Sequence, residues 1–470
     1  MARMLSPPSC ERAFLGTVLH TPVCGQLEVL PEALIVVGGD GVIKAIHRRE
    51  TAEAEGEARR FATRGELIAL GSDQYLLPGM VDLHVHAPQW PQLGKALDLP
   101  LEQWLQAYTF PLESRYADPA YAQTVYESLV EGLLANGTTT ALYFGTLHLP
   151  ATQILADVCL RRSQRALVGR VAMDDIQQCP PYYRDPSAAV AEAETRAFIE
   201  YVQSMPGNHT GLIKPVITPR FIPSCTDDLL SRLGALARET GCHVQTHCSE
   251  SDWEHSYVLD RCGRTDTAAL DGFGLLSRRT ILAHGNFVSD ADIALIRSRG
   301  SGIAHCPLSN VYFSDAVFPL RKILKQGVHV GLGTDIAGGA SPSILENARH
   351  AVIASRSLES GVSPAQQRDQ RRSPDSRIDA VTAFWLATAG GGIALDLPIG
   401  VFKEGFQFDA ILVDARAQDS NLRLDGNDAP ADVLQKIIYH AGRANIREVW
   451  VANRLVHSQA RFSSPLSPSI

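Results

Sequence analysis

Short apolar runs recur along the middle of the chain, and each is followed by a stretch with helical spacing of apolar and polar positions. We expect eight of these runs to be strands. They cover residues 81–86, 138–144, 166–173, 213–221, 243–250, 280–286, 302–310 and 328–335. Eight strands alternating with helices predict an α/β fold of the (β/α)8 TIM-like barrel type. A doubly wound parallel sheet is the alternative that the pattern leaves open.

The two ends of the chain show a different pattern, with strand-like segments separated by turn residues. Residues 34–37 and 42–43 are apolar and flank Gly-Gly-Asp-Gly, a sequence that favours a hairpin. Toward the other end, residues 408–413 and 448–451 are largely apolar, and Ala-Asn at 452–453 fits a tight turn. We therefore expect both ends to pair into one small β-sandwich module.

These patterns divide the chain into four parts. Residues 1–77 and 397–457 form the two halves of the β module, residues 78–396 form the barrel, and residues 458–470 form a Ser/Pro-rich tail expected to be disordered. The arginine-rich segment 363–377 resembles an insertion in the barrel region. A solvated loop is the favoured interpretation of this segment, and a docking patch is the alternative.

Composition and charge narrow the class of protein. The 470 residues are 45% hydrophobic and 20% charged, as in ordinary globular proteins. The net charge is −8 and there is no long basic run, which argues against nucleic acid and anionic membranes as partners. We find no signal peptide in the first residues and no apolar run long enough to cross a bilayer. Nine scattered cysteines without a Cys-x-x-Cys pair favour reduced thiols and the cytoplasm.

Metal-preferring side chains fall at the predicted carboxyl ends of four strands, where a (β/α)8 barrel builds its active site. His84 and His86 end the first strand, where residues two apart point to the same face. His247, His284 and Asp335 end the fifth, sixth and eighth strands. A lone buried histidine is usually a core residue, and a lone aspartate can cap a helix. Together they predict a metal site whose nitrogen and oxygen ligands suit zinc, with iron or manganese as alternatives.

The number of metal ions depends on whether a bridging group is present. A two-metal centre in this architecture often uses a modified lysine late in the fourth strand. Lys214 is in that strand but near its start, so it should lie at the opposite end of the barrel. We therefore expect one metal ion per chain.

Several segments carry a resemblance to a known family. The run Pro-Gly-Met-Val-Asp-Leu-His-Val-His at 78–86 resembles the opening signature of the amidohydrolase superfamily. Within it, the guanine deaminase family is the closer match, on residues 86–89, 102–111, 218–221, 245–250, 305–310 and 332–339. The resemblance spans most of the chain, from about residue 78 to 388. The chain departs from the family pattern at residues 174–176, at 311–313 and in the arginine-rich segment.

The resemblance implies a zinc-dependent hydrolase that deaminates guanine to xanthine and ammonia, a step of purine catabolism. It implies four ligands for one zinc ion, with water completing the coordination shell: His84, His86, His247 and Asp335. His284 would lie beside the water. Glu250 would carry a proton from the water to N3 of guanine and later to the leaving amine, and Asp335 would take the second proton.

The resemblance also implies a set of residues that bind the base: Gln89, Trp90, Arg220, Phe221, His86, His247 and Glu250. A guanidinium group only donates hydrogen bonds, so Arg220 matches the acceptor O6 of guanine and disfavours the amine of adenine. Gln89 both donates and accepts, and Phe221 offers an aromatic wall. Trp104 and Tyr108, four apart on a predicted helix, would cover the pocket as a lid, with plain packing as the alternative.

Two other functions are compatible with parts of this pattern. Another amino-heterocycle deaminase, or a chlorohydrolase acting on triazines, would keep the metal and change the substrate, but Arg220 with Gln89 argues against both. A non-catalytic scaffold would have lost metal ligands, and here all of them are present. The family is generally dimeric, so the resemblance implies a homodimer. The residues alone leave the metal loaded in the cell and activity on related purines open.

Overall fold

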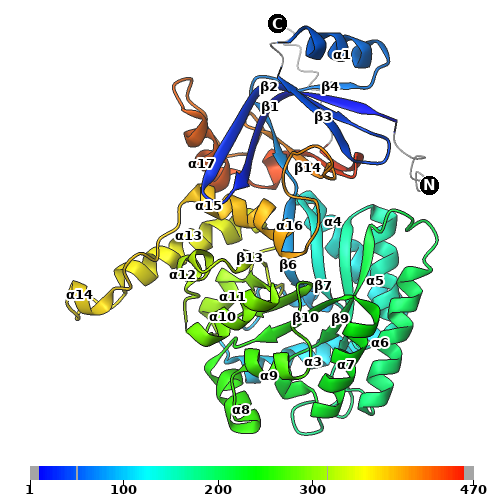
Figure 1. Ribbon diagram of the computed structural model, residues 1–470, viewed down its shortest axis with the longest axis vertical. Coiled ribbons are helices and arrows are strands. Elements are labelled where there is room, and N and C mark those ends of the chain that lie inside the picture. Colours follow the sequence, from blue (N-terminus) through cyan, green and yellow to red (C-terminus); the bar gives the residue numbers. More distant parts are fainter. Residues whose placement is uncertain (1–9, 49–50, 315, 460–470) are drawn as a thin grey trace, which may run out of the picture.

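The computed structural model describes residues 10–48, 51–314 and 316–459 and arranges their strands in two sheets. In one sheet, eight parallel strands lie side by side in sequence order, with helices around them (Figure 1). These strands are β6 (Met80–His86), β7 (Thr138–Phe144), β8 (Arg165–Ala172), β9 (Ile213–Pro219), β10 (His243–Cys248), β11 (Thr280–His284), β12 (Gly302–His305) and β13 (His329–Leu332). The strand order never reverses, so the (β/α)8 barrel is confirmed and the doubly wound sheet is excluded.

The ring closes between β6 and β13 through a buried carboxylate and the backbone. Asp82 accepts from the backbone N–H of Thr334 at 2.9 Å and from the Thr334 hydroxyl at 2.6 Å. One residue further, the N–H of Asp335 donates to the carbonyl oxygen of His84 at 2.8 Å. These bonds hold the segment that follows β13 against β6, so they bring the first and last predicted metal ligands together.

Several strands end earlier than the apolar runs predicted. The run 302–310 is a strand only to His305, because Pro307 begins helix α11 (Pro307–Phe313) and proline favours the first turn of a helix. The runs 213–221 and 243–250 stop being strands at Pro219 and Cys248. The residues beyond these strand ends form loops at the carboxyl face, and those loops carry Arg220 and Glu250.

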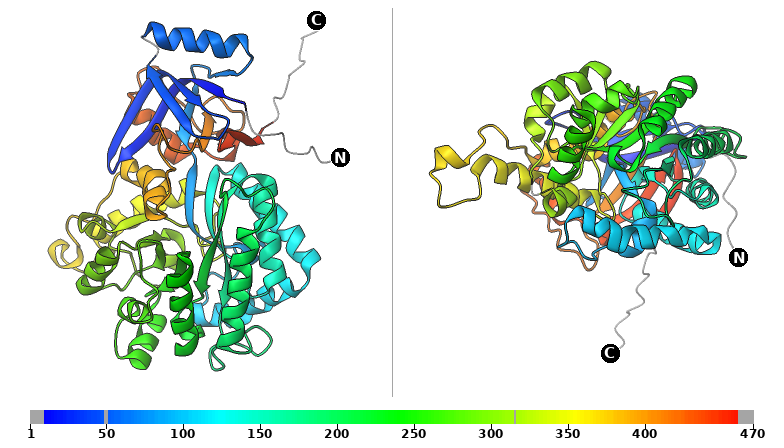
Figure 2. Two further views of the ribbon diagram at one scale, coloured as in Figure 1. Left: turned by 45° about the vertical axis from the view of Figure 1, so that its right-hand side comes forward. Right: turned by 90° about the horizontal axis from the view of Figure 1, so that it is seen from below.

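Helices cover the outside of the barrel (Figure 2). Besides α11, these helices are α4 (Pro119–Ala135), α5 (Leu149–Arg162), α6 (Ala188–Gln203), α7 (Asp227–Thr240), α8 (Asp252–Cys262), α9 (Asp266–Gly272), α10 (Asp290–Arg299), α12 (Leu320–Lys325), α13 (Ile344–Ser360), α15 (Ala380–Trp385) and α16 (Gly391–Ala394). Side chains at the first residues satisfy the free N–H groups of several helices. Ser289 and Asp292, for example, form a capping box on α10.

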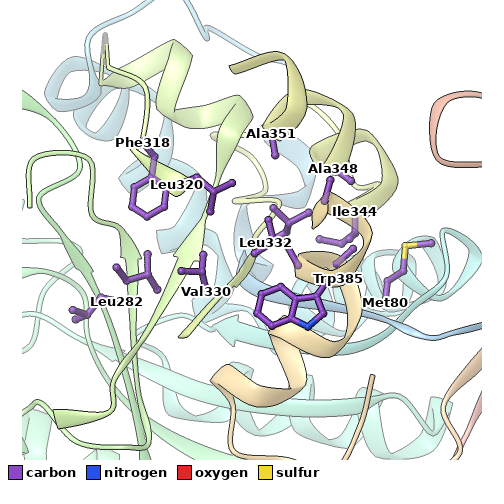
Figure 3. Close-up of a cluster of buried hydrophobic side chains, with 14 of the residues drawn as sticks. Met80, Leu282, Phe318, Leu320, Val330, Leu332, Ile344, Ala348, Ala351 and Trp385 are labelled. Carbon is purple, nitrogen blue, oxygen red and sulfur yellow. The ribbon is translucent and has the colours of Figure 1, made fainter. Parts of the chain in front are cut away.

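Two apolar layers hold the strands in place. Between the strands and helices α12, α13 and α15, a buried cluster includes Met80, Leu282, Phe318, Leu320, Val330, Leu332, Ile344, Ala348, Ala351 and Trp385 (Figure 3). A second cluster joins side chains of six strands: Val81, Leu83, Leu142, Leu167, Val216, Ile281 and Ala304. Residues from so many strands can touch only inside the ring, so the polar groups at the carboxyl end rest on a packed apolar floor.

The two ends of the chain form the second sheet, which sits against the amino-terminal end of the barrel strands (Figure 2). Its strands are β1 (Arg12–Val23), β2 (Gln26–Val37), β3 (Ile43–Arg48), β4 (Leu67–Ala69), β5 (Gln74–Pro78), β14 (Ala410–Asp414), β15 (Ile446–Val451) and β16 (Arg454–Ser458). Strand β5 pairs with β14 and so joins the N-terminal half to the C-terminal half. A β module built from both ends is thereby confirmed, including the turn at Ala452 and Asn453, whose φ angles are 45° and 63°.

The N-terminal region also contains a helix where the pattern predicted only strands. Helix α1 (Ala52–Thr63) begins after Thr51, whose hydroxyl accepts from the N–H of Ala54. Glu53 and Glu55 lie in its first turn, where acidic side chains complement the helix dipole. The strong strand signals on both sides obscured this helix in the sequence.

The arginine-rich segment, whose role the sequence leaves open, lies at the edge of the fold. The arginine-rich segment is largely exposed and contains one short helix, α14 (Arg368–Arg371), while α17 (Pro430–His440) packs beside α13 and α15. The predicted tail begins where β16 ends at Ser458, and from residue 460 it lies outside the described residues. No helix among the described residues has the length and apolar character needed to span a membrane.

Candidate active site

Four side chains from three strand ends converge at the carboxyl face of the barrel. His84 and His86 come from β6, His247 comes from β10, and Asp335 follows β13. Asp335 Oδ1 lies 3.1 Å from His84 Nε2 and 3.5 Å from His86 Nε2. The Nε2 atoms of His86 and His247 are 3.0 Å apart. The ring nitrogens and the carboxylate therefore face one common point.

The state of these rings fits a bound cation. His247 Nδ1 lies 2.5 Å from the carbonyl oxygen of Arg220, so Nδ1 carries the proton and Nε2 presents its lone pair. Burial, and then nearby positive groups, lower the pKa of His84, His86 and His247 well below the usual value, so the rings are neutral. His84 Nε2 has no hydrogen-bond partner among the described residues. Neutral imidazoles and a carboxylate arranged in this way fit a zinc ion.

Glu250 and His284 lie beside this cluster. His284 Nε2 is 3.6 Å from Glu250 Oε1 and 3.9 Å from Asp335 Oδ2. His284 Nδ1 lies 2.9 Å from the side-chain oxygen of Asn310, which makes Nδ1 the donor and leaves Nε2 able to accept. Burial, followed by repulsion from Asp335, raises the pKa of Glu250 well above its usual value. A carboxyl group that holds a proton this readily is suited to proton transfer.

A polar wall faces the cluster across a cavity. Arg220, in the loop after β9, is 2% exposed and donates through both terminal nitrogens to Glu113, at 2.7 and 3.2 Å. Gln89, in the 3-10 turn Ala87–Gln92, donates to Glu113 at 2.9 Å and accepts from the N–H of Ala337 at 3.1 Å. Both side chains are therefore held in one orientation beside the predicted metal ligands.

The rest of the cavity wall is apolar. It is formed by side chains from the loop after β9, from α11 and from the segment that follows the first barrel strand: Leu101, Trp104, Leu105, Phe221 and Phe313. Trp104 packs against Phe313 with ring centroids 5.0 Å apart. The cavity therefore suits a flat heteroaromatic ring. Such a ring would lie between apolar walls, with polar groups at one edge and a metal at another.

Comparison with known proteins places the chain in a family. Residues 75–456 match the Amidohydrolase family. The chain is also 36% identical to guanine deaminase of Mus musculus, over 96% of this chain and 97% of that protein. The chain belongs to the guanine deaminases of the amidohydrolase family. With guanine deaminase of Homo sapiens the identity is 35%, again over 96% and 97% of the two chains.

Solved structures of related enzymes share the fold of this chain. Guanine deaminase from C. acetobutylicum, solved with guanine bound in its active site, superposes with a TM-score of 0.84 at 30% identity, covering 95% of this chain and all of that one. An adenosine deaminase from Xanthomonas campestris, solved with bound zinc, has a TM-score of 0.78 at 26% identity over 96% and 93% of the chains. A triazine hydrolase at 18% identity shares the fold alone.

The cavity contains most of the residues predicted to bind the base but not Trp90. Gln89, Arg220, Phe221 and Glu250 line it, together with three of the predicted metal ligands, His86, His247 and Asp335. The Trp90 indole N–H instead donates to the Ser128 hydroxyl on α4 at 3.1 Å. In the 3-10 turn, consecutive side chains point in different directions, so Gln89 turns inward and its neighbour packs outward. Trp90 therefore does not line the cavity in the described structure, and a role for it in binding the base stays a prediction.

Of the two residues predicted to cover the pocket, only Trp104 lies at the cavity. Trp104, at the end of α2 (Leu101–Trp104), is buried and lines the cavity, whereas Tyr108 is 42% exposed. Residues Leu105–Thr109 form a π-helical turn, which widens the helix and moves the residue four positions on to another face. The spacing rule for regular α-helices therefore fails at this point.

The position of Lys214 agrees with its predicted place. It is the second residue of β9, it is half-buried, and its charged neighbours are Arg165, at the start of β8, and Arg279. These residues lie at the amino ends of the strands, away from the histidine cluster. No lysine therefore lines the described cavity.

Sequence reasoning assigned no role to Glu113 or to the side chain of Asn310. Glu113 lies on α3 (Phe110–Ser114), directly after the π-helical turn, and its side chain is 1% exposed. An acidic residue in a short helix usually faces solvent, so its type alone gave no signal. Asn310 was noted only as part of the family motif, and its contact with His284 depends on the fold of α11.

Proposed function

We propose that this protein hydrolyses guanine to xanthine and ammonia, with one zinc ion per chain. The observation that carries the proposal is the buried cluster of His84, His86, His247 and Asp335, at a cavity that Glu250, Gln89 and Arg220 also line. The same activity is named for the relatives in mouse and human, and the relative from C. acetobutylicum was solved with guanine bound.

The residues fit a zinc ion, which would be held by His84, His86, His247 and Asp335. When bound there, zinc lowers the pKa of a water from about 15.7 toward about 7, so hydroxide is available near neutral pH. His284 Nε2 would accept a hydrogen bond from this water, since Asn310 occupies the opposite ring nitrogen. The apolar floor and the buried loops keep bulk water away.

The chemistry on the ring requires proton transfers that Glu250 can perform. Glu250 would deliver a proton to N3 of guanine, which makes C2 electrophilic enough for hydroxide to add. Asp335 would accept the proton that remains on the added hydroxyl. Glu250, which takes up this proton in turn, would pass it to the amine, so that the C2–N bond breaks, ammonia leaves and the C2 carbonyl of xanthine forms. Proton transfer of this kind contributes about 10²- to 10⁴-fold to the rate.

The polar wall would orient the base. Arg220 would donate to O6, while Gln89 would contact a ring edge that carries both a donor and an acceptor. Phe221 would contact the face of the ring. Adenine would leave Arg220 facing an amine, and a buried donor without an acceptor costs about 1–3 kcal/mol.

A steady-state assay across ring systems tests this function. We expect ammonia release from guanine with kcat/KM at least about 100-fold above the values for adenine, cytosine and an amino-triazine, because only guanine satisfies the polar wall. The Arg220→Ala variant should bind zinc normally and lose much of this preference. Equal or higher kcat/KM for another ring would assign the cavity to that substrate instead.

The compartment and the assembly are part of the proposal. We place the protein in the cytoplasm, which is supported by nine cysteines that are all free in the described chain. We propose a homodimer on the family resemblance. Light scattering on the purified protein measures the assembly directly, and a monomer mass would contradict the dimer.

A further inference from the structure

Glu113 receives hydrogen bonds from three other side chains inside the cavity wall. Its Oε2 accepts from Arg220 at 2.7 Å and from the Tyr183 hydroxyl at 2.8 Å. Its Oε1 accepts from Gln89 at 2.9 Å and from Arg220 again at 3.2 Å. A carboxylate has about four acceptor positions, and all of them are used here. The group therefore acts as the common anchor of the two residues that face the base.

These contacts fix the chemical identity of the edge that Gln89 presents. The N–H of Ala337 requires an acceptor, and the Glu113 carboxylate requires a donor. The amide oxygen of Gln89 must therefore point to Ala337 and its nitrogen to Glu113, and a flipped amide would lose both bonds. As a result, Glu113 also sets the direction of the second N–H and of the remaining lone pair of the Gln89 amide.

The same contacts set the direction and charge of Arg220. Its two terminal nitrogens are held in a bidentate pair with Glu113, and its guanidinium carbon lies 5.1 Å from the ring centre of Phe110. One N–H on each terminal nitrogen remains for a ligand. The positive charge is balanced at the point where it would meet the substrate, and a wall of this kind suits a neutral ring better than an anionic one.

We propose that Glu113 is a positioning residue for base recognition, which fixes the hydrogen-bonding edge formed by Gln89 and Arg220 and selects a neutral purine over an anionic one. This inference rests on the proposed function. Glu113 does not itself line the cavity, and without this role it would be only one half of a buried ion pair with Arg220.

The Glu113→Gln variant separates recognition from stability. Gln keeps the shape, but its NH₂ group faces donors of Arg220 or Gln89, and the charge of Arg220 is no longer balanced. We expect the KM for guanine to rise about 10- to 100-fold while kcat changes less than about threefold. Inhibition by urate, a planar purine that is an anion at neutral pH, should strengthen about tenfold. Opposite shifts for a neutral and an anionic purine are not produced by general loosening of the fold.

The matched control is Asp409→Asn, which breaks a different buried ion pair. Asp409 accepts from Arg165 at 2.8 and 3.1 Å at the amino end of the barrel strands. We expect this variant to lower Tm but to leave the KM for guanine and the inhibition constant of urate within about twofold of the wild-type values.

Glu113→Asp provides a second test if the Gln variant does not fold. It keeps the charge but is one methylene shorter, so we expect a raised KM for guanine with unchanged inhibition by urate. Wild-type protein without activity on guanine would overturn the proposed function itself. An active wild type with Glu113 variants that match Asp409→Asn in guanine KM and urate inhibition would overturn the role of Glu113 alone.

Discussion

At the scale of single residues, the neighbours of Glu250 determine its chemistry. Glu250 is buried beside Asp335, and both burial and repulsion raise its pKa. Its Oε1 lies 3.6 Å from His284 Nε2, and its side chain lines the cavity that the proposed substrate would occupy. Among the described residues that line the cavity, Asp335 has the only other carboxyl group, and it is one of the predicted zinc ligands.

The Glu250→Gln variant tests this role. We expect zinc content equal to that of the wild type and kcat lowered by about 10²- to 10⁴-fold, because the amide cannot carry a proton. Elemental analysis and an ammonia assay measure the two quantities. Glu239→Gln, on the exposed surface of α7, is the control and should keep the zinc content and the kcat of the wild type. Undiminished turnover in the Glu250 variant would remove this residue from the mechanism.

Residue types and strand ends were enough to predict the histidines and Asp335 as a metal site, because each of them ends or follows an apolar strand. The family resemblance was needed for Glu250, Arg220 and Gln89. Neither kind of argument predicted the burial of Glu113 beside the cavity or the direction of the Trp90 side chain. The burial of Glu113 depends on the path of the chain after a π-helical turn, and the direction of Trp90 depends on a 3-10 turn. Local periodicity does not record such changes in helix type.

At the scale of elements, the contact between β6 and β13 decides whether the metal ligands meet. Asp82 accepts from the N–H and the hydroxyl of Thr334, and it also accepts from the N–H of His84 at 3.2 Å. The carboxylate thus connects the strand that carries two histidines to the loop that carries Asp335. Loss of this connection should affect the geometry of the ligands as well as the stability of the barrel.

We predict that Asp82→Asn weakens zinc binding at least about tenfold and lowers the free energy of unfolding by about 1–3 kcal/mol, because Oδ2, which accepts from the Thr334 hydroxyl, becomes an NH₂ group and the two N–H groups at Oδ1 lose a charged acceptor. Asp292→Asn is the matched control, since Asp292 also accepts from a backbone N–H and a hydroxyl, both of Ser289, far from the metal cluster. It should lower stability without changing zinc affinity. Zinc affinity retained in the Asp82 variant would contradict the role given to this contact.

The elements themselves were predicted well where apolar runs are bounded by turn residues. Strand β7 matches its predicted range in full, and the others begin within one residue of prediction. Strand ends were less predictable, because apolar residues continue into the loops that line the cavity. Helix α1 was missed because it lies between two strand-rich segments and its signal is a cap at Thr51 rather than a long periodic pattern.

At the scale of the whole molecule, distant parts of the sequence build one site on one scaffold. The β module ties both chain ends together through β5 and β14, and the Arg165–Asp409 pair connects it to the barrel. The barrel then presents all the predicted metal ligands at the opposite, carboxyl end. The sequence could predict this arrangement because the alternation of strands and helices imposes it.

The central claim is that one metal ion at this face, together with the surrounding residues, deaminates guanine. The most direct measurement is ammonia and xanthine formation from guanine by the purified protein, before and after removal of metal with a chelator, followed by titration with zinc. We predict that activity disappears with the metal and returns fully at one equivalent of zinc per chain. Undiminished ammonia release from metal-free protein, or zinc-loaded protein that forms no xanthine, would contradict the account.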